Sequence, residues 1–170
     1  LSIILIGSRQ DSLIYVNIKK KKCLELGIIC DIYNYDNDIL DNIIIDKINE
    51  LNINSNIKGI MVQLPIPKNL DKNKIISQID PKKDIDGLHP YNLGKIMNNE
   101  IPYFYPCTPL ACVTLLEYYN IDIEGKHIVF VGTGMVNLPL SIMLLHKKCS
   151  LSLCNEYTEN IKEKTNVADI

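Results

Sequence analysis

Tyr15, Lys19, Gln63 and Asp86 have the side-chain types and the positions in the sequence of a catalytic group. Tyr15 and Lys19 are four residues apart in a segment with helical periodicity, so they share one face, with Cβ atoms roughly 5–6 Å apart. An aromatic ring and an amine at this spacing can flank one bound substrate. A surface lysine beside a half-buried tyrosine is the alternative that spacing alone leaves open.

Gln63 lies at the end of an apolar run, residues 57–63, that is typical of a buried parallel strand, and Pro65 and Pro67 then end that run. In an open α/β sheet, ligands bind at the carboxyl ends of the strands, which is where this prediction places Gln63. Asp86 follows in a turn-rich segment, after a short helix predicted at about residues 72–79. The sequence therefore assigns the amine, the amide and the carboxylate to three separate elements.

The elements that must position these side chains alternate as in βαβ units. Helices are predicted at residues 12–26 and 39–52, the first with Asp11 or Ser12 as its N-cap, and the segment 84–109 is predicted as a loop. The helices alternate with strands, which predicts a parallel sheet covered by helices on its faces. The predicted strands are residues 3–6, 28–33 and 57–63.

A second α/β segment follows a helix predicted at residues 110–119. Gly132, Thr133 and Gly134 come directly after the predicted strand 127–131 and open a helix that ends near His146; another strand is predicted at 151–154. A Gly-x-Gly turn in this position lets the backbone approach a pyrophosphate at a helix N-terminus. The predicted fold class is α/β, with an N-terminal catalytic domain (1–119) built on a parallel sheet, followed by the start of a Rossmann-type dinucleotide-binding domain (120–170).

The composition excludes several classes of function. The net charge of −2 gives no electrostatic footprint for nucleic acid, and the four lysines from Lys19 to Lys22 point around the helix rather than along one face. No stretch approaches the roughly 20 apolar residues that a membrane span needs. The six cysteines include no Cys-x-x-Cys pair and no histidine at ligand spacing, so we expect no metal site and reduced thiols.

Four segments, in this order, resemble the signature blocks of the methylenetetrahydrofolate dehydrogenase/cyclohydrolase family: Ser12-x-x-Tyr15-Val16-x-x-Lys19, Val62-Gln63-Leu64-Pro65, Lys83 to Pro90, and Pro106-Cys107-Thr108-Pro109. The resemblance implies oxidation of 5,10-methylenetetrahydrofolate with NAD(P)+ and hydrolysis of the 5,10-methenyl product to 10-formyltetrahydrofolate, in one-carbon metabolism and purine biosynthesis. The closing segment, residues 167–170, resembles one that leads into the next Rossmann strand. We therefore expect an incomplete chain that ends within its second domain.

The resemblance also implies roles for the residues of the first domain. Lys19 activates the attacking water, which an amine does only in its neutral form, and burial against ligand and protein favours that form. Gln63 orients the amine without adding a negative charge. Tyr15 packs on the folate and hydrogen-bonds near the reacting centre, and Asp86 accepts hydrogen bonds from the pterin.

Ser12 and Cys107 match family positions near the substrate. For both, a structural role is the alternative that we favour: Ser12 as a helix N-cap, and Cys107 as a small apolar side chain in the Pro-Cys-Thr-Pro turn.

For the cofactor, the resemblance implies NADP or NAD, held at Gly132, Thr133 and Gly134. The chain departs from the family because it lacks an arginine after Gly132 and has Asn137 where the general fingerprint has Gly or Ala. Glu156 stands where members carry a serine that helps hold a 2′-phosphate; a carboxylate there repels that phosphate and can bind a ribose hydroxyl. NAD specificity, a decayed dinucleotide site in a protein that only hydrolyses, and NADP use through other residues are the three alternatives.

Two alternative functions remain for the whole chain. The first is a degenerate folate-binding module or partner subunit without activity. The second is another two-domain dehydrogenase, such as one that acts on amino acids. The family resemblance implies a homodimer with a folate ligand and no nucleic-acid or membrane partner. It favours a cytoplasmic location, with mitochondria or another organelle left open.

Overall fold

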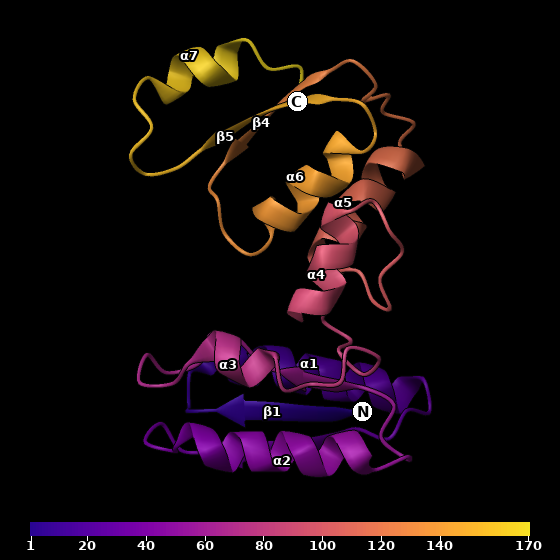
Figure 1. The fold of residues 1–170 in the computed structure, drawn as a ribbon, viewed down its shortest axis with the longest axis vertical. Coiled ribbons are helices and arrows are strands. Elements are labelled where there is room, and N and C mark those ends of the chain that lie inside the picture. Colours follow the sequence, from indigo (N-terminus) through magenta and orange to yellow (C-terminus); the bar gives the residue numbers. More distant parts are fainter. The chain divides into compact units, whose positions relative to one another are not determined.

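The computed structural model describes residues 1–170, which divide by their contacts into two compact units, Leu1–Pro90 and Tyr91–Ile170 (Figure 1). Both units are α/β, as predicted. None of the helices is both long and apolar enough to cross a membrane.

The first unit is built on a three-stranded parallel sheet of order β2-β1-β3, with β1 at Ser2–Ile6, β2 at Asp31–Tyr35 and β3 at Ile60–Val62. All five residues of the central strand β1 are buried, as a continuous apolar run predicts. Beyond β3, the N–H of Gln63 still donates to the carbonyl of Ile4 at 2.8 Å. Gln63 therefore lies at the carboxyl end of β3.

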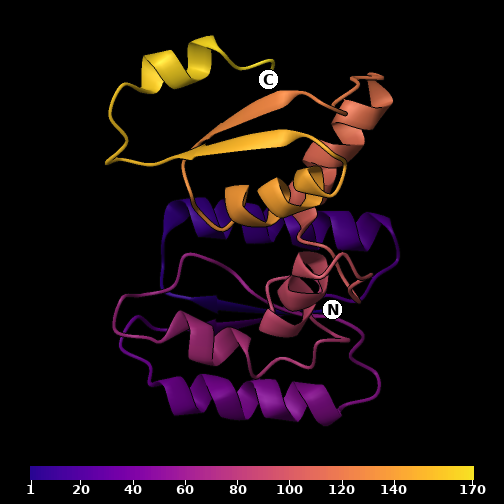
Figure 2. The ribbon, with the colours of Figure 1, turned by 45° about the horizontal axis from the view of Figure 1, so that its top comes forward.

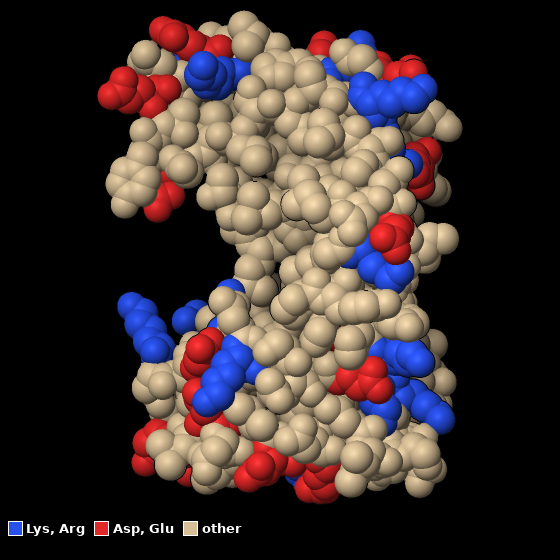
Figure 3. Space-filling view, in the orientation of Figure 1, with Lys and Arg blue, Asp and Glu red and all other residues tan.

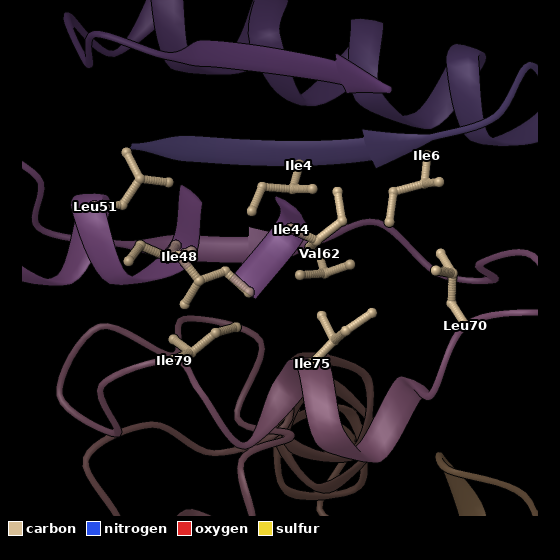
Figure 4. Close-up of a cluster of buried hydrophobic side chains, with 10 residues drawn as sticks. Ile4, Ile6, Ile44, Ile48, Leu51, Val62, Leu70, Ile75 and Ile79 are labelled. Carbon is tan, nitrogen blue, oxygen red and sulfur yellow. The ribbon is translucent and has the colours of Figure 1, made fainter. Parts of the chain in front are cut away.

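Helices cover both faces of this sheet (Figure 2). Ile4 and Ile6 point to one face, where they pack with residues of α2 (Asp41–Ile53) and α3 (Lys72–Ile76) (Figure 4). Ile3 and Leu5 point to the other face and pack with Val16 of α1 (Gln10–Glu25). Because successive side chains of a strand alternate, one strand contributes to two cores.

Two predicted strands are shorter than the apolar runs that suggested them. The strand predicted at 28–33 begins only at Asp31, because Gly27 has a left-handed φ of 69° and the N–H of Ile28 donates back to the carbonyl of Cys23 at 2.8 Å. The run 57–63 forms a strand only from Ile60, since residues 54–57 make a turn. For the first run the expected burial is also wrong, because Ile28 and Ile29 are exposed. Hydrogen bonding set the strand boundary in both cases.

The N-cap of α1 is Arg9, so the prediction of Asp11 or Ser12 at this position is wrong. The Asp11 carboxylate accepts from the Arg9 guanidinium at 2.6 Å and from the N–H of Ser12 at 2.8 Å. These contacts place Asp11 in the first turn, where a carboxylate complements the helix dipole. The Arg9 hydrogen bond also holds the pKa of Asp11 at about 2.

The second unit packs its helices on a two-stranded parallel sheet of β4 (His127–Val131) and β5 (Ser150–Cys154). The helices are α4 (Pro90–Met97), α5 (Cys107–Tyr118), α6 (Asn137–Leu145) and α7 (Ile161–Asn166). The carbonyl of His127 accepts from the N–H of Asp169 at 2.8 Å, and the N–H of Val129 donates to the carbonyl of Ile170 at 2.9 Å. Residues 169 and 170 thus bind the edge of β4.

Helix α4 lies within the segment that was predicted as a loop. Its start at Pro90 was a usable signal, because proline favours the first position of a helix. Ile96 of α4 and Val113 of α5 pack in one core with Phe130 of β4 and Leu140 of α6. The compact units consequently divide after Pro90 rather than at the predicted 119/120 boundary. The assignment of folate chemistry to residues 1–119 and dinucleotide binding to 120–170 stays a prediction.

Charges of both signs are interspersed on the surface seen in Figure 3. Exposed ion pairs such as Lys22–Glu25 and Lys148–Glu124 place opposite charges side by side.

Candidate active site

Lys19 and Gln63 are in direct contact, although 44 residues separate them in the sequence. The Lys19 Nζ donates to the Gln63 Oε1 at 2.8 Å, and Gln63 is 8% exposed. The Gln63 Nε2 donates to the carbonyl of Leu64 at 2.7 Å. Because that bond uses the amide nitrogen, the amide oxygen is the atom directed at the lysine.

Asp86 is the third member of this group. Burial raises the pKa of Asp86, the nearby Lys19 ammonium lowers it, and the Asp84 carboxylate raises it further. The net direction is upward, so desolvation outweighs the attraction of the lysine. An amine, an amide oxygen and a partly desolvated carboxylate therefore gather within the first unit.

Asp84 organises the loop that carries Asp86. It is 1% exposed, and its carboxylate accepts from the N–H of His89 at 2.8 Å and from the N–H of Leu88 at 3.3 Å. The N–H of Gly87, at a left-handed φ of 67°, donates to the Asp84 carbonyl. These bonds close the loop around one carboxylate. The sequence alone indicates no role for Asp84.

Lys83 ties the same loop to the end of α2. Its Nζ donates to the carbonyls of Leu51, Asn52 and Asn54 at 3.0, 2.6 and 2.9 Å. Carbonyls at a helix C-terminus lack partners within the helix, and a lysine satisfies them well. The Lys83 carbonyl accepts from the N–H of Ile60 at 2.7 Å, which aligns the loop beside β3. The sequence alone likewise indicates no role for Lys83.

Gly59 lets this loop approach β3 closely, and replacing it with alanine is expected to lower stability. A Cβ at this position would stand 2.5 Å from the Ile85 Cγ2, a contact that a β-branched side chain cannot avoid without moving the loop. We expect Gly59→Ala to lower the free energy of unfolding by about 1–3 kcal/mol, measured by urea denaturation.

Gly94→Ala is the matched control. Gly94 lies in α4 with open space around its hypothetical Cβ, so alanine there should leave stability unchanged or raise it by up to about 1 kcal/mol. Equal stability of Gly59→Ala and the unsubstituted protein would contradict the close approach.

Tyr15 and Ser12 lie on the same helix as Lys19 and differ in exposure. Tyr15, one turn before Lys19, is 60% exposed, so its ring is available to a ligand. Ser12 is 3% exposed, and its hydroxyl has no hydrogen-bond partner. An unsatisfied buried hydroxyl costs about 1–3 kcal/mol. Ser12 is therefore not the predicted N-cap, because a capping hydroxyl would be bonded to a backbone N–H.

Cys107 is the first residue of α5, in the second unit, and its side chain is exposed. The expectation that it packs as a small buried side chain is wrong for this reason. The structure brings together Lys19, Gln63 and Asp86 within the first unit.

The predicted dinucleotide turn joins β4 to α6 as expected. Gly132 has a φ of 112°, a conformation that favours glycine, and the N–H groups of Gly134 and Val136 bond to no backbone acceptor. Unpaired N–H groups at the start of a helix are the donors that bind a pyrophosphate. The residues present therefore fit a dinucleotide.

Asn137 stands where the general dinucleotide-binding fingerprint has glycine or alanine, and its side chain forms hydrogen bonds that stabilise this turn. Its Nδ2 donates to the carbonyl of Gly132 at 3.0 Å and, more weakly, to that of Val131 at 3.4 Å. The side chain thereby links the end of β4 to the start of α6. A Cβ on Gly132 would lie 3.2 Å from that nitrogen, so the turn has little room for another residue type.

Glu156 lies in an exposed turn just after β5. The Asn155 Oδ1 accepts from the N–H of Tyr157 at 3.0 Å, and the N–H of Asn155 donates to the Thr158 hydroxyl at 2.8 Å. These bonds fix the turn on both sides of Glu156 and leave its carboxylate in solvent.

Two family models match this chain. The tetrahydrofolate dehydrogenase/cyclohydrolase catalytic domain matches residues 1–86, and the NAD(P)-binding domain of the same family matches residues 106–170. The bifunctional protein FolD of Aquifex aeolicus is 42% identical over 171 residues, covering 100% of this chain and 59% of that protein. The corresponding protein of Chlamydia muridarum is 43% identical over 175 residues, covering 61% of its length.

Solved structures agree with this comparison. The crystal structure of the bifunctional FolD methylenetetrahydrofolate dehydrogenase/cyclohydrolase of Campylobacter jejuni has a TM-score of 0.95 and 38% identity, covering 99% of this chain and 60% of that one. The Trypanosoma brucei enzyme, solved with NADP and an inhibitor, has a TM-score of 0.94 and 29% identity, covering 99% of this chain and 58% of that one. The chain thus spans about 60% of the length of these relatives. Since both family models match in order and the first alone covers 86 of the 170 residues, the chain belongs to the tetrahydrofolate dehydrogenase/cyclohydrolase family.

Proposed function

We propose that the first unit binds a tetrahydrofolate derivative beside Lys19 and hydrolyses 5,10-methenyltetrahydrofolate to 10-formyltetrahydrofolate. The observation that carries this proposal is the 2.8 Å contact between the Lys19 Nζ and the Gln63 Oε1, with Asp86 close by. The family membership and the substrates named for its relatives support it.

In this proposal Lys19 is the general base. Hydrolysis requires a water molecule to attack the methenyl carbon and lose a proton, and a neutral amine can accept that proton. Gln63 accepts one N–H of Lys19, which directs the remaining nitrogen valences away from the amide. Because Gln63 is uncharged, it orients the amine without stabilising the ammonium form, as a glutamate would.

Asp86 holds the substrate rather than reacting with it. A carboxylate accepts the hydrogen bonds that the amino and ring N–H groups of a pterin donate. Tyr15 offers an exposed ring for packing against the folate. Ser12 lies on the same helix with its hydroxyl buried, so its proposed role is to support the helix behind the folate site rather than to contact the ligand. Cys107, which matches a family position near the substrate, is proposed as a peripheral contact only.

The direct test is the rate at which the methenyl absorbance of 5,10-methenyltetrahydrofolate disappears with and without the protein. We expect the protein to accelerate hydrolysis well above the buffer rate, with saturation in substrate. Tight folate binding without acceleration would instead favour the non-enzymatic folate-binding alternative. If the protein neither binds the folate nor accelerates its hydrolysis, the proposal is wrong.

We further propose that the second unit binds a nicotinamide dinucleotide for oxidation of 5,10-methylenetetrahydrofolate. Gly132, Thr133 and Gly134, with the first turn of α6, would hold its pyrophosphate. The bound nicotinamide supplies a hydride acceptor for the one-carbon bridge. In the same reaction, Asp86 and Tyr15 keep the folate oriented, as they do for hydrolysis.

We propose NAD rather than NADP as the preferred cofactor. The exposed Glu156 carboxylate at the end of β5 would repel a 2′-phosphate and accept a hydrogen bond from a ribose hydroxyl. Titration of NAD and NADP by calorimetry should give the lower Kd for NAD, and Glu156→Ser should narrow the difference. Tighter binding of NADP would contradict this preference, whereas binding of neither would favour a decayed site in a protein that only hydrolyses.

A homodimer, a cytoplasmic location and a contribution to purine biosynthesis are further proposals, supported by the family resemblance. Sedimentation at several concentrations tests the first of them: we expect twice the mass of the chain.

A further inference from the structure

Lys83 supplies a positive charge to the C-terminal end of α2, a helix that has no basic residue in its own last turn. Its ammonium donates to the carbonyls of Leu51, Asn52 and Asn54 at 2.6–3.0 Å. An ammonium has three N–H donors, and these three carbonyls use all of them. Lys83 therefore has no donor left for a ligand, and it can affect the folate site only through the segments that it joins.

A residue of α2, Asn52, holds the chain that leads into Lys83. The Asn52 Nδ2 donates to the carbonyl of Gln78 at 2.7 Å, and the Asn52 Oδ1 accepts from the N–H of Asp80 at 2.9 Å. The carbonyl of Asp80 then accepts from the N–H of Lys83 at 2.7 Å. The end of α2 and the segment 78–83 are consequently joined by two side chains, one from each partner.

Asp86 follows directly on residues that are anchored in this way. The carbonyl of Lys83 accepts from the N–H of Ile60 in β3 at 2.7 Å and from that of Ile85 at 2.9 Å. The Ile85 side chain packs against the core that includes Ile3 of β1. Only two residues separate Lys83 from Asp86, and both form hydrogen bonds of their own. A displacement of Lys83 would therefore move the Asp86 carboxylate as well.

We propose that Lys83 is a positioning residue, which holds the Asp86 carboxylate in place for a folate by binding the end of α2. This inference rests on the proposed function, because it takes Asp86 as the group that binds the substrate. Without the Lys83 ammonium, the segment that leads into the Asp86 loop loses three hydrogen bonds. Asp86 then occupies its binding position in only a fraction of the molecules, and the affinity for folate falls by that fraction.

The test is a double-mutant cycle on folate affinity, with the Kd obtained by fluorescence titration for Lys83→Met, for Asp86→Asn and for the variant with both changes. We expect Lys83→Met to raise the Kd by about 3–30-fold, less than Asp86→Asn does. The kcat at saturating folate should stay nearly unchanged, because Lys19 and Gln63 lie on other elements. In the Asp86→Asn background, Lys83→Met should cost almost no further affinity, since the residue through which it acts is already lost.

Hydrogen exchange provides a readout that needs no folate. Two backbone N–H groups of the loop donate to the Asp84 carboxylate, and we expect their exchange to be faster in Lys83→Met than in the unsubstituted protein. Asn52→Ala removes the second attachment and should speed the same exchange, even if Lys83→Met fails to fold. Lys58→Met, which changes an exposed lysine ahead of β3, is the control and should alter neither the exchange nor the Kd.

Three results would overturn the proposal. The first is unchanged exchange in the Asp86 loop of both Lys83→Met and Asn52→Ala, and the second is an unchanged Kd in Lys83→Met. The third is a loss of affinity from Lys83→Met that is equally large with and without the Asp86 carboxylate, because a general loss of stability acts in both backgrounds. If the unsubstituted protein binds no folate, the proposed function is wrong instead, and the exchange measurement still decides whether Lys83 holds the loop.

Discussion

Replacing Lys19 with methionine is expected to lower kcat for hydrolysis of 5,10-methenyltetrahydrofolate by roughly 10²–10⁴-fold, the usual contribution of a general base. Methionine keeps much of the unbranched side chain but has no group that accepts a proton. Folate binding should survive, because Asp86 and Tyr15 are unchanged in this variant. The measurement is the initial rate of hydrolysis together with the Kd for a folate, obtained from fluorescence titration.

Lys21→Met is the matched control for this experiment. Lys21 lies two residues further along the same helix, and its side chain is exposed, so its loss should leave hydrolysis unchanged. Gln63→Glu adds a discriminating result: a carboxylate beside Lys19 would stabilise the ammonium and should reduce hydrolysis at neutral pH. A Lys19→Met enzyme with an undiminished kcat would eliminate Lys19 as the base.

Asp86→Asn is expected to weaken folate binding and to stabilise the unliganded protein. Loss of a charged hydrogen-bond acceptor typically costs about 1.5–3 kcal/mol, which corresponds to a roughly 10–150-fold rise in Kd. The change in stability has the opposite sign because burial raises the pKa of this carboxyl in the folded state. Ionisation of Asp86 therefore costs folding free energy at neutral pH, and asparagine avoids that cost.

The pH dependence gives this prediction a second readout. At a pH above the raised pKa of Asp86, Asp86→Asn should have the larger free energy of unfolding by its maximum amount. Below the ordinary value of 3.8 the difference should vanish, because the carboxyl is protonated in both the folded and the unfolded state. Urea denaturation at several pH values measures it, with the exposed Asp38→Asn as control. An unchanged folate Kd would remove Asp86 from the binding site, and a loss of stability at neutral pH would contradict the burial argument.

Local patterns in the sequence were sufficient to predict several features. The continuous apolar run of β1 predicted a strand buried on both faces, and the Gly132 turn between a strand and a helix was predicted at its observed place. Gln63 was placed correctly at the end of a strand, because prolines follow it directly. Each of these features is signalled by the types of neighbouring residues: apolar runs favour a buried strand, and glycines and prolines mark where an element ends.

The features that could not be predicted depend on partners distant in the sequence. Helix α4 forms where the prolines and turn residues had suggested a loop, because Ile96 of α4 packs in one core with Phe130 and Leu140. The compact units divide at Pro90 because α4 and α5 bury their apolar faces against β4 and α6. Burial against another element is a tertiary property, and periodicity within one helix does not identify that element.

In the candidate site, too, some features follow from the sequence and others only from the fold. The sequence by itself determined which side chains were available: an amine at Lys19, an amide at Gln63 and a carboxylate at Asp86, each on its own element. Only the tertiary structure decided that the amide oxygen faces the amine and that Lys83 and Asp84 hold the Asp86 loop. The physical reason is that hydrogen-bond geometry and desolvation depend on distances of a few ångströms between segments, which the packing of β1 and β3 beneath α1 sets.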